Sequence, residues 1–477
     1  MTRTKIVCTI GPASADEGVL RQMLRAGMSV ARLNFSHGDH ATHEQYIGLL
    51  RRLAREEDVN LAIMQDLQGP RLRIGVLEEE VVNLVAGQEF ILTGRQVVGT
   101  DREVTVEGVD LAREVAPGNT VLIDDGQIEL TVVRTGDEDV VTRVATGGPI
   151  RSRKGINVPG VTLSVPTITE KDRRDLRFGI EQGVDFVAMS FVRSAADVTE
   201  LRRLMAEMGG EAPIIAKIEK HEAVAAFDAI LEAADGIMVA RGDLGVETSA
   251  EEVPIVQKMA IAKCNAVGKP VITATQMLNS MIQSPRPTRA EASDVANAIL
   301  DGTDAVMLSG ETSIGHYPVL AVKTMARIAT KAEDLLGRTW ARAADRGRAE
   351  DETADAIGRA TVEIAEGIGA KAILTMTSSG YTARLIARHR PSEPIVAITH
   401  RETTLRRLAL TWGVTAMLVP HYDSVDSLFA IADRAASASG AAKAGDSIVI
   451  TAGLPIGLGG RTNLLNIHTV GESAASQ

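Results

Sequence analysis

The sequence has little cysteine and few aromatic residues. Its 477 residues include two cysteines, Cys8 and Cys264, which excludes a disulfide framework and favours the reducing cytoplasm. Two Trp, four Tyr and seven Phe leave few rings for stacking against bases, and the net charge of −11 disfavours a polyanionic partner. We therefore expect neither nucleic acid nor a membrane surface as a partner, and a few local Lys and Arg residues must hold any anionic ligand.

Several recognisable segments are also missing. No run of about 18 apolar residues occurs, so we expect no membrane span. The first residues, MTRTKIVCTIGP, lack the long apolar stretch of a secretory signal. The sequence contains no GxxxxGK[ST] loop and no Cys/His cluster with zinc spacing. The glycine-rich GLGG at 457–460 has no helical pattern after it, so it is only a weak indication of a dinucleotide site.

Short apolar runs rich in β-branched residues recur along the chain, with amphipathic stretches between most of them. Runs of this length are typical of buried parallel strands, and eight strand–helix units close a (β/α)8 barrel. We therefore predict an α/β fold built on a TIM barrel. The eight runs are KIVCTI (5–10), VARLNFS (30–36), LAIMQDL (61–67), DFVAMSFV (185–192), IIAKIE (214–219), GIMVARGD (236–243), VITATQM (271–277) and AVMLSGET (305–312).

Two further regions differ from the barrel pattern. Between the third and fourth runs, short alternating segments divided by Gly and Asp-Gly turns predict an inserted all-β lid domain. After residue 335, a polar segment precedes four apolar runs that alternate with helical patterns, which predicts a smaller α/β domain with an open parallel sheet. We therefore expect a barrel at 1–69 and 168–335, a lid at 70–167 and a C-terminal domain at 336–477.

Polar side chains gather where the predicted barrel strands end, which is where such barrels carry their reactive groups. Alternation places Arg32, Asn34 and Ser36 on one face of the second strand. It places Lys217 and Glu219 together on one face of the fifth strand. These two strands alone would bring two cations and one carboxylate toward the rim of the barrel.

Two later strands add to the same rim. Asp243 follows Gly242 at the end of the sixth strand, and Thr273 and Thr275 are predicted to share a face of the seventh. Four separate strands would thus bring an arginine, a lysine, two carboxylates and hydroxyl groups together.

This set of side chains suits a hard divalent metal ion together with a phosphate. Mg²⁺ takes one or two protein carboxylates, which Glu219 and Asp243 supply, while Lys217 and Arg32 would neutralise transferring phosphoryl oxygens. Each feature alone has a plainer interpretation: Lys217 and Glu219 as a strand-end ion pair, and RGDLG as a turn that caps a helix. Their coincidence on one rim favours a functional site.

With these residues in view, the sequence resembles the pyruvate kinase family over nearly its whole length. The matching segments are KIVCTIGPAS, ARLNFSHG, IIAKIEKHEAV, DGIMVARGDLGVE, the block from KPVITATQML to VMLSGET, and the C-terminal GRTN. The resemblance implies a barrel with a β-rich lid inserted after the third strand and a C-terminal regulatory domain. It also implies phosphoryl transfer from phosphoenolpyruvate to ADP, giving pyruvate and ATP in glycolysis, with Mg²⁺, or Mn²⁺ in its place, as cofactor.

Carried over position by position, the resemblance implies roles at the rim. Lys217 matches the lysine that stabilises charge on the transferring phosphoryl group and on the enolate. Glu219 and Asp243 match the Mg²⁺ ligands, and Arg32 matches a phosphate-binding arginine.

The resemblance also implies contacts for the rest of the substrates. The backbone at Gly242 and the following aspartate matches the site for the substrate carboxylate, and N–H groups at a helix start suit an anion. Thr275 matches the threonine tied to enolate protonation, through water. Asn34, Arg73 and Lys171 match residues near the nucleotide. The last two flank the inserted domain, so its closure could bring them to the phosphates.

In the C-terminal domain, hydroxyl groups and a glycine lie at a strand-to-helix turn, an arrangement that can cradle a phosphate. An ordinary helix cap would need only one of these hydroxyls. The position matches the family's effector loop, so the resemblance implies a sugar-phosphate or nucleotide monophosphate activator, and the family is usually a homotetramer. The loop residues are Thr377, Ser378, Ser379, Gly380 and Thr382.

The sequence departs from the commonest family pattern after the third strand. Members that need K⁺ carry Thr-Lys-Gly-Pro-Glu there, and the ion is held by positions that match Asn34, Ser36, Asp66 and the Leu67 carbonyl. Here the acidic position is Arg71, whose guanidinium is always protonated and would repel a bound cation. We therefore predict activity without K⁺; the plainer alternative is that Arg71 points to solvent.

Two other functions remain open. A metal-dependent lyase or aldolase acting on pyruvate-like acids would also use an arginine and two carboxylates on Mg²⁺, but it leaves the inserted domain, Arg73 and Lys171 unexplained. A non-catalytic scaffold predicts a lost charge at position 217, 219 or 243, and all three charges are present.

Overall fold

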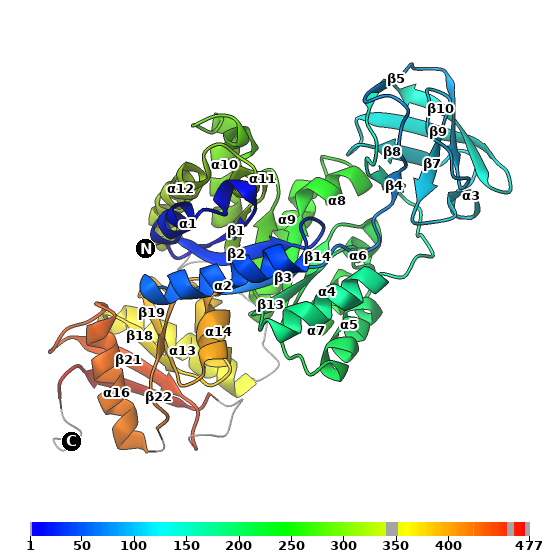
Figure 1. Ribbon diagram of the computed structural model, residues 1–477. Helices are drawn as coiled ribbons and strands as arrows, with labels where there is room; N and C mark the ends of the chain where they lie inside the picture. Colours follow the sequence, from blue (N-terminus) through cyan, green and yellow to red (C-terminus); the bar gives the residue numbers. More distant parts are fainter. Residues whose placement is uncertain (1, 340–351, 423, 456–461, 473–477) are drawn as a thin grey trace.

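The computed structural model describes residues 2–339, 352–422, 424–455 and 462–472. Its strands form a closed barrel, a seven-stranded sheet with a small two-stranded one beside it, and a five-stranded sheet. Figure 1 shows the barrel, in blue and green, between the cyan inserted domain and the yellow-to-red C-terminal domain. The inserted and C-terminal domains therefore lie at opposite ends of the molecule.

Each of the eight apolar runs predicted as strands overlaps one strand of the closed barrel, which confirms the TIM-barrel prediction. The strand order is β1-β17-β16-β15-β14-β13-β3-β2, and β1 pairs in parallel with both β17 and β2. The strands are β1 (Lys5–Thr9), β2 (Met28–Asn34), β3 (Ala62–Asp66), β13 (Phe186–Met189), β14 (Ile214–Ile218), β15 (Gly236–Ala240), β16 (Val271–Ala274) and β17 (Ala305–Leu308).

Two apolar layers hold the barrel together. Alternate strand residues such as Val30, Met64 and Ile215 fill its interior, and their neighbours face the surrounding helices. The chain leaves the barrel after β3, forms the inserted domain and returns to the barrel before α4 (Glu170–Glu181). The inserted domain therefore takes the place of a loop at the carboxyl end of the barrel. This is the end where polar residues follow the strands.

The helices around the barrel begin and end where the sequence supplies caps. Capping boxes form between Thr169 and Asp172 at α4 and between Thr288 and Glu291 at α10, and α9 ends at Gly268 with φ of +69°. No helix within the described ranges is both long and apolar enough to cross a membrane. The helices are η1 (Pro12–Ser14), α1 (Glu17–Arg25), α2 (His40–Glu56), α4 (Glu170–Glu181), α5 (Ala195–Glu207), α6 (His221–Ala225), α7 (Phe227–Ala233), α8 (Arg241–Glu247), α9 (Val253–Val267), η2 (Asn279–Ile282), α10 (Arg289–Asp301), α11 (Gly310–Ser313) and α12 (Pro318–Thr339).

The insert forms its own β domain around a separate core that includes Phe90, Leu130 and Val144. One short helix, α3 (Leu111–Glu114), interrupts the strands. The sequence patterns missed β4, β11 and β12, because strands of two or three residues carry no readable alternation. The strands are β4 (Arg73–Ile74), β5 (Val82–Leu84), β6 (Glu89–Thr93), β7 (Glu103–Glu107), β8 (Thr120–Ile123), β9 (Ile128–Thr135), β10 (Asp139–Thr146), β11 (Gly148–Ile150) and β12 (Ile156–Asn157).

The C-terminal sheet has the order β20-β19-β18-β21-β22. Its first four strands are parallel as predicted, but β22 pairs antiparallel with β21, so the expectation of a wholly parallel sheet is wrong there. Residues 453–463 separate these two strands, fewer than the dozen or so that a parallel crossover requires. The elements are α13 (Glu352–Ile368), β18 (Ile373–Met376), α14 (Tyr381–Ala387), β19 (Ile395–Thr399), α15 (Glu402–Arg407), η4 (Leu408–Leu410), β20 (Val414–Leu418), α16 (Val425–Ala438), β21 (Ser447–Ala452) and β22 (Leu464–Thr469).

Three sequence segments lie wholly or partly outside the described residues. They are the GLGG at 457–460, the first two residues of GRTN and most of the polar segment that follows residue 335. Both cysteines are described, and both are buried and free. Burial raises the pKa of each thiol, so Cys8 and Cys264 act as core residues and not as nucleophiles.

A buried arginine joins the C-terminal domain to the barrel base. Arg390 Nη1 donates to Asp304 Oδ1 at 2.8 Å, and Nη2 donates to Asn265 Oδ1 at 2.8 Å and to the Gly302 carbonyl at 2.7 Å. The guanidinium carbon lies 4.8 Å from the centroid of the Trp412 ring. Because Asp304 immediately precedes β17, this contact lies at the amino end of the barrel strands, opposite the lid.

Candidate active site

Strand alternation aims a row of charged side chains into the barrel mouth. Arg32, Asp66 and Lys217 each lie two positions after a buried apolar residue of the barrel interior, and Glu219 continues the row beyond β14. Their exposed fractions are 9%, 1%, 7% and 1%. Charged groups this deeply buried need partners, and the four supply them to one another.

Asp66 lies at the centre of this cluster. Its Oδ2 accepts a hydrogen bond from Arg32 Nε at 2.6 Å, and its Oδ1 accepts one from Lys217 Nζ at 3.3 Å. Lys217 Nζ also donates to Ser190 Oγ at 2.7 Å and lies 2.7 Å from Glu219 Oε1. One carboxylate therefore fixes both a guanidinium and an ammonium at the mouth.

The cluster sets its own protonation states. Burial by itself raises the pKa of Asp66, but the charges of Arg32 and Lys217 outweigh burial, and the pKa lies below its ordinary value. Burial lowers the pKa of Lys217, whereas Asp66 and Glu219 raise it and prevail. Lys217 is therefore a charged ammonium at neutral pH, as neutralisation of an anion requires.

Glu219 and Asp243 form a pair of carboxylates at the edge of the cluster. Burial raises the pKa of Glu219, and Asp243 adds to this rise while Lys217 opposes it. Glu219 Oε2 accepts the Phe191 N–H at 2.6 Å. Asp243 lies in the first turn of α8, lines a cleft beside the mouth and makes no side-chain hydrogen bond with the described residues.

This pair fits a divalent cation of the Mg²⁺ type. The repulsion between the two carboxylates is the charge that such an ion neutralises, and Mg²⁺ commonly takes one or two carboxylates and completes its shell with water and substrate phosphate. Within the described part of the chain, no group of three or more His, Cys, Asp or Glu side chains forms a fuller cage. The arrangement thus suits an ion shared between protein and substrate.

Thr275 reaches the mouth through a left-handed backbone. β16 ends at Ala274, and Thr275 and Gln276 have φ values of +67° and +55°. Thr275 Oγ1 accepts the Gly242 N–H at 2.7 Å and donates to the Ala274 carbonyl at 2.7 Å. An anion that binds the Gly242 N–H must therefore compete with this hydroxyl.

The prediction that Thr273 and Thr275 share a face is wrong. Thr273 lies within β16 on the outer, helix-facing side, where its Oγ1 donates to Thr303 Oγ1 at 3.0 Å. Alternation stops where the strand stops, and the left-handed residues that follow turn the chain toward the mouth. Thr273 is a buried residue of the barrel wall.

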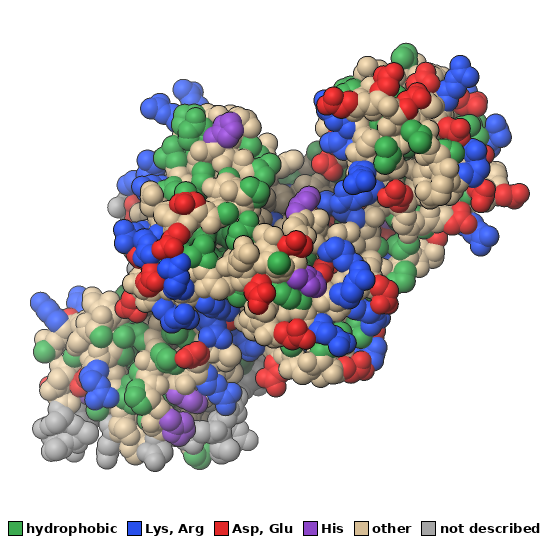
Figure 2. Space-filling model, viewed as in Figure 1, with side chains coloured by type: hydrophobic (Ala, Val, Ile, Leu, Met, Phe, Trp, Pro, Cys, Tyr) green, Lys and Arg blue, Asp and Glu red, His purple; other side chains and the backbone are tan. Residues whose placement is uncertain are grey.

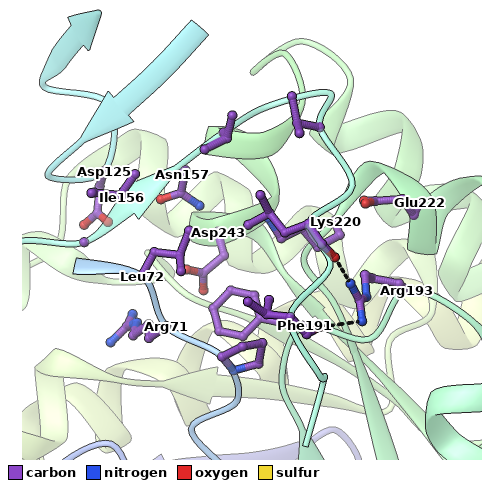
Figure 3. A pocket seen from close by; sticks show the side chains of 16 residues that line it. Arg71, Leu72, Asp125, Ile156, Asn157, Phe191, Arg193, Lys220, Glu222 and Asp243 are labelled. Carbon is purple, nitrogen blue, oxygen red and sulfur yellow. Dashed lines mark hydrogen bonds between the residues drawn. The ribbon is translucent and has the colours of Figure 1, made fainter. Parts of the chain in front are cut away.

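A cleft runs from the mouth toward the lid. Arg71, Leu72 and Asn157 line its lid side, and Phe191 and Asp243 line its barrel side (Figure 3). Figure 2 shows Lys and Arg side chains gathered where the lid meets the barrel. The cleft therefore combines an acidic floor near Asp243 with basic side chains along its rim.

Three arginines act on His37 beside this cleft. Burial lowers the pKa of His37, and the charges of Arg71, Arg73 and Arg32 lower it further. The Arg71 side chain is exposed and makes no hydrogen bond or ion pair with the described residues, while Arg73 Nη1 donates to the Arg153 carbonyl at 3.2 Å. Among the described residues, Arg71 thus adds a positive charge beside the mouth that no carboxylate pairs with, which suits a polyanionic ligand.

Lys171 lies on the same rim. Its Nζ donates to the Phe35 carbonyl at 2.6 Å and to Asp175 Oδ2 at 2.5 Å. Asn34 Oδ1 accepts the Ser36 N–H at 3.1 Å, so the segment 34–36 is folded around its own hydrogen bonds. With 40% of its side chain exposed, Lys171 remains accessible from solvent.

The residues predicted for a monovalent-cation site lie at the ends of β2 and β3. Asn34 is paired with Asp66 across these strands, and the Leu67 carbonyl accepts a hydrogen bond from Ser190 Oγ at 2.7 Å. Ser36 follows on the same rim and is half-buried. Both Asp66 oxygens already accept hydrogen bonds from cationic side chains.

The loop predicted to cradle a phosphate in the C-terminal domain uses several hydroxyls internally. Thr377 Oγ1 accepts the Gly380 N–H at 2.9 Å, and Thr382 Oγ1 shares a 2.8 Å hydrogen bond with another threonine hydroxyl. Ser378 is half-buried and Ser379 is exposed. Gly380 has φ of +83° and precedes α14.

Three residues of the site were missed from the sequence. Ser190 holds Lys217, the Phe191 N–H holds Glu219, and His37 lies among the arginines. Strand alternation could have identified Ser190, since it lies on the same face as the interior residues of β13. Phe191 contributes a backbone N–H at φ of +55°, which no side-chain pattern reports.

Comparisons with known proteins cover almost the whole chain. The family model described as pyruvate kinase, barrel domain, matches residues 1–322, and the model for the pyruvate kinase alpha/beta domain matches residues 355–468. The chain is 50% identical to a pyruvate kinase of Geobacillus stearothermophilus over 476 residues, which is 99% of this chain and 81% of that one.

Two further relatives agree in length. A pyruvate kinase of Clostridium acetobutylicum is 45% identical over 472 residues, covering 98% of this chain and 100% of that one. A solved structure of a pyruvate kinase from Cryptosporidium parvum superposes with a TM-score of 0.92 at 38% identity and covers 98% of this chain and 96% of its own.

Proposed function

Because the chain belongs to the pyruvate kinase family, we propose that its barrel mouth transfers the phosphoryl group of phosphoenolpyruvate to ADP through the cluster around Lys217. The enzyme forms pyruvate and ATP, a reaction of glycolysis. The observation that supports the role of the cluster is a buried ammonium 2.7 Å from Glu219 and 3.3 Å from Asp66, at the carboxyl end of a closed barrel.

The transfer breaks the bond between phosphorus and the enol oxygen and forms a bond between phosphorus and a terminal oxygen of ADP. Negative charge shifts onto the enol oxygen as this happens. Lys217 and Arg32 neutralise the phosphoryl oxygens, and Lys217 also stabilises the enolate. Because Asp66 fixes both cations before substrate binds, they need no reorganisation during the reaction.

Pyruvate kinases generally depend on a divalent metal ion. In this chain Glu219 and Asp243 would hold Mg²⁺, or Mn²⁺ in its place. When bound, the ion supplies further positive charge to the phosphoryl oxygens.

The enolate needs a proton at its methylene carbon to become pyruvate. Thr275 would deliver this proton through water, and the backbone at Gly242 and Asp243 would bind the substrate carboxylate. The Gly242 N–H donates a hydrogen bond to Thr275 Oγ1, which links carboxylate binding to proton delivery. A substrate carboxylate that accepts the Gly242 N–H would break this bond and free the Thr275 hydroxyl.

The nucleotide would bind along the lid side of the mouth. Asn34, Arg73 and Lys171 would contact it, supported by the arginine charges that act on His37. Lid closure would move Arg73 toward the phosphates and exclude water from the transferring group.

Arg71 would replace the monovalent cation. Its exposed guanidinium, without an acidic partner in the described chain, would supply the positive charge that K⁺ supplies in other members, where the ion is held by positions that match Asn34, Ser36, Asp66 and the Leu67 carbonyl. We expect equal activity in potassium and tetramethylammonium buffers at matched ionic strength. A strong rise on adding K⁺ would contradict this role.

Regulation would reside in the C-terminal domain. A sugar phosphate or nucleoside monophosphate would bind at Thr377, Ser378, Ser379, Gly380 and Thr382 and activate a cytoplasmic homotetramer. We place the domain boundaries at 1–69 and 168–335 for the barrel, 70–167 for the lid and 336–477 for the regulatory domain. Titration of candidate effectors against half-saturation by phosphoenolpyruvate tests the loop.

A coupled assay with phosphoenolpyruvate, ADP and Mg²⁺ tests the function as a whole. We expect pyruvate formation that requires ADP and stops when the metal is chelated. Pyruvate formation independent of ADP would instead indicate a lyase.

A further inference from the structure

A cavity of about 820 Å³ lies between the barrel base and the C-terminal domain, and we name it the seam cavity. Its barrel wall includes Phe186, Pro213 and Pro270, which lie at the amino ends of barrel strands. Its other wall includes Arg384 of α14 and Arg407 of α15. The volume is within the range of sites for small molecules, and the location is at the end of the barrel opposite the active site.

The cations of the seam cavity divide into two kinds. Some are already paired with acidic residues across short distances: Arg202 with Asp235 at 2.9 Å and Lys263 with Asp228 at 2.5 Å. Arg384 and Arg407, in contrast, form no ion pair with any carboxylate of the described residues. Among the described residues, therefore, no carboxylate lies within ion-pair distance of either guanidinium, although the charge of Asp235 acts on both from farther away.

Within the described ranges, most donors of the two arginines are unused. Arg384 Nη1 donates to the Ser379 carbonyl at 3.3 Å, and Arg407 Nη2 donates to the Glu211 carbonyl at 3.0 Å. Arg407 Nε is buried and has no hydrogen-bond partner among the described residues. A guanidinium has five N–H groups, so each arginine can still bind an anion with two of them.

The two charges also repel each other. Burial lowers the pKa of both arginines. The charge of Arg407 lowers the pKa of Arg384 further, whereas Asp235 and Tyr381 oppose this. For Arg407, the charge of Arg406 adds to the lowering of the pKa, whereas Asp185, Glu211 and Asp235 oppose it. Two half-buried cations that face one cavity and repel each other are stabilised by a shared anion.

We propose that the seam cavity binds a small molecule that carries a phosphate monoester, with Arg384 and Arg407 as the phosphate ligands. A tetrahedral dianion presents enough oxygen acceptors for two guanidiniums and cancels both charges, whereas a carboxylate cancels only one. The remaining volume of the cavity accommodates the organic part of the ligand.

This site differs from the loop at 377–382. Of the loop, only Ser379 lines the seam cavity, whereas Thr377 and Thr382 form hydrogen bonds elsewhere. A variant of the loop and a variant of the cavity therefore separate the two positions.

Equilibrium dialysis of the full chain with labelled glycerol 3-phosphate tests the proposal, with glycerol and inorganic phosphate as competing probes. Saturating phosphoenolpyruvate keeps the active site filled. We expect Arg384→Met and Arg407→Met each to weaken binding roughly tenfold or more, since each removes charge-assisted hydrogen bonds. Arg384→Lys retains the charge and should retain part of the affinity. We expect inorganic phosphate to compete and glycerol not to compete.

Two controls fix the position of the ligand. Arg202→Met alters a cation of the same cavity that is already paired, and it should bind like the wild type. Ser378→Ala alters the proposed effector loop outside the cavity, and it should retain the binding that depends on Arg384 and Arg407. Unchanged affinity in both Arg→Met variants, or no saturable binding in the wild type, would overturn the proposal. Loss of binding in Ser378→Ala alone would place the ligand at the loop and would overturn it equally. Turnover at saturating substrate and thermal unfolding verify that each variant folds. If Arg384→Met does not fold, the binding data of Arg384→Lys and Arg407→Met test the proposal.

Discussion

At the scale of single residues, the active site depends on how one ammonium is held. Lys217 is almost fully buried, yet it keeps its charge because Asp66 and Glu219 lie within 3.3 and 2.7 Å of its Nζ. Ser190 fixes its direction. A cation placed this firmly can stabilise developing charge without moving, which is the main contribution that a protein makes to phosphoryl transfer.

We expect Lys217→Met to lose about 10²–10³-fold or more in turnover while it retains the fold, because a preorganised charge donor is removed. Steady-state kinetics and the binding of phosphoenolpyruvate, followed by fluorescence, separate chemistry from binding. Lys258→Met, at an exposed lysine of α9 paired with Asp301, is the matched control and should keep normal turnover. Near-normal turnover of Lys217→Met would refute its role.

Arg71 provides a second prediction at this scale. We expect Arg71→Glu to make the enzyme depend on K⁺, because the substitution removes the fixed charge and restores the acidic residue that K⁺-dependent members carry at this position. Activity is measured in tetramethylammonium and in potassium buffer at equal ionic strength. Arg71→Lys keeps the charge and should remain indifferent to K⁺. Equal K⁺ responses in all three proteins would show that Arg71 is a solvent-facing residue.

At the scale of elements, helices contact strands closely where a side chain is absent. Gly179 of α4 faces Gln65 of β3, and a Cβ atom there would lie 2.0 Å from Gln65 Oε1. Gln65 is fully buried, and its Nε2 donates to the Asp175 carbonyl at 2.6 Å. The glutamine cannot move aside without losing this hydrogen bond.

We therefore expect Gly179→Ala to lower the free energy of unfolding by about 1–3 kcal/mol through overpacking. Gly48→Ala is the matched control, because a Cβ atom at this position in α2 would meet no atom within 4 Å. It should raise stability by about 0.4–1 kcal/mol, since alanine loses less backbone entropy than glycine on folding. Denaturant titration measures both, and a neutral Gly179→Ala would show that α4 can shift freely.

The first two helices supply a pH-dependent prediction. Hydrogen bonds from Arg25 and Arg21 lower the pKa of Glu57 to about 2, from an ordinary value of 4.5, and Arg52 and Arg21 do the same for Glu17. The contribution of these two glutamates to the free energy of unfolding is therefore fully present above pH 4.5 and is lost as the pH falls toward about 2. Its size is small and decreases with salt, because the network is exposed.

We expect the unfolding free energy of Glu57→Gln to fall less steeply with decreasing pH than that of the wild type over this acid range. The reason is that the variant takes up fewer protons when it unfolds. Glu44→Gln, at an exposed glutamate of α2 outside the network, should follow the wild type. Denaturant titrations across the range measure the slopes. Parallel slopes for Glu57→Gln and the wild type would contradict the assignment.

At the scale of the whole molecule, the barrel lies between a lid at its carboxyl end and the C-terminal α/β domain at its base (Figure 1). Arg390 is the buried connection to the base, with hydrogen bonds to Asp304, Asn265 and Gly302. This arrangement separates the site of chemistry from the seam cavity by the length of the barrel.

We expect Arg390→Met to destabilise the protein by about 3–5 kcal/mol, because it leaves the buried Asp304 carboxylate without its charge partner. Calorimetry should show a lower midpoint, with the C-terminal domain separating from the barrel transition. Turnover near room temperature should change little, since the active site is at the other end of the barrel. Arg401→Met, at an exposed arginine of the same domain, should leave the midpoint unchanged, and an equal effect of both variants would argue against the connection.

Strand patterns determined much of the architecture. The apolar runs predicted all eight barrel strands, and the Gly-rich alternating segments predicted the β insert, because side-chain periodicity is a local property. Alternation also placed Arg32, Lys217 and Glu219 on inward faces. The strand β22 and the short strands β4, β11 and β12 were not predictable, since their pairing depends on partners distant in sequence.

What the sequence by itself determined is therefore which residues line each strand and which motifs they form. Only the tertiary structure decided which carboxylate joins Arg32 to Lys217 and that Thr275 and not Thr273 reaches the mouth. It also decided that Arg384 and Arg407 line one cavity without an ion pair to any described carboxylate. These features arise because closure of the barrel and docking of the C-terminal domain bring together side chains that lie far apart in the sequence. Their spacing along the chain does not predict that they meet. Burial then fixes their charges, because a buried ionisable group takes its protonation state from whichever neighbours the fold supplies.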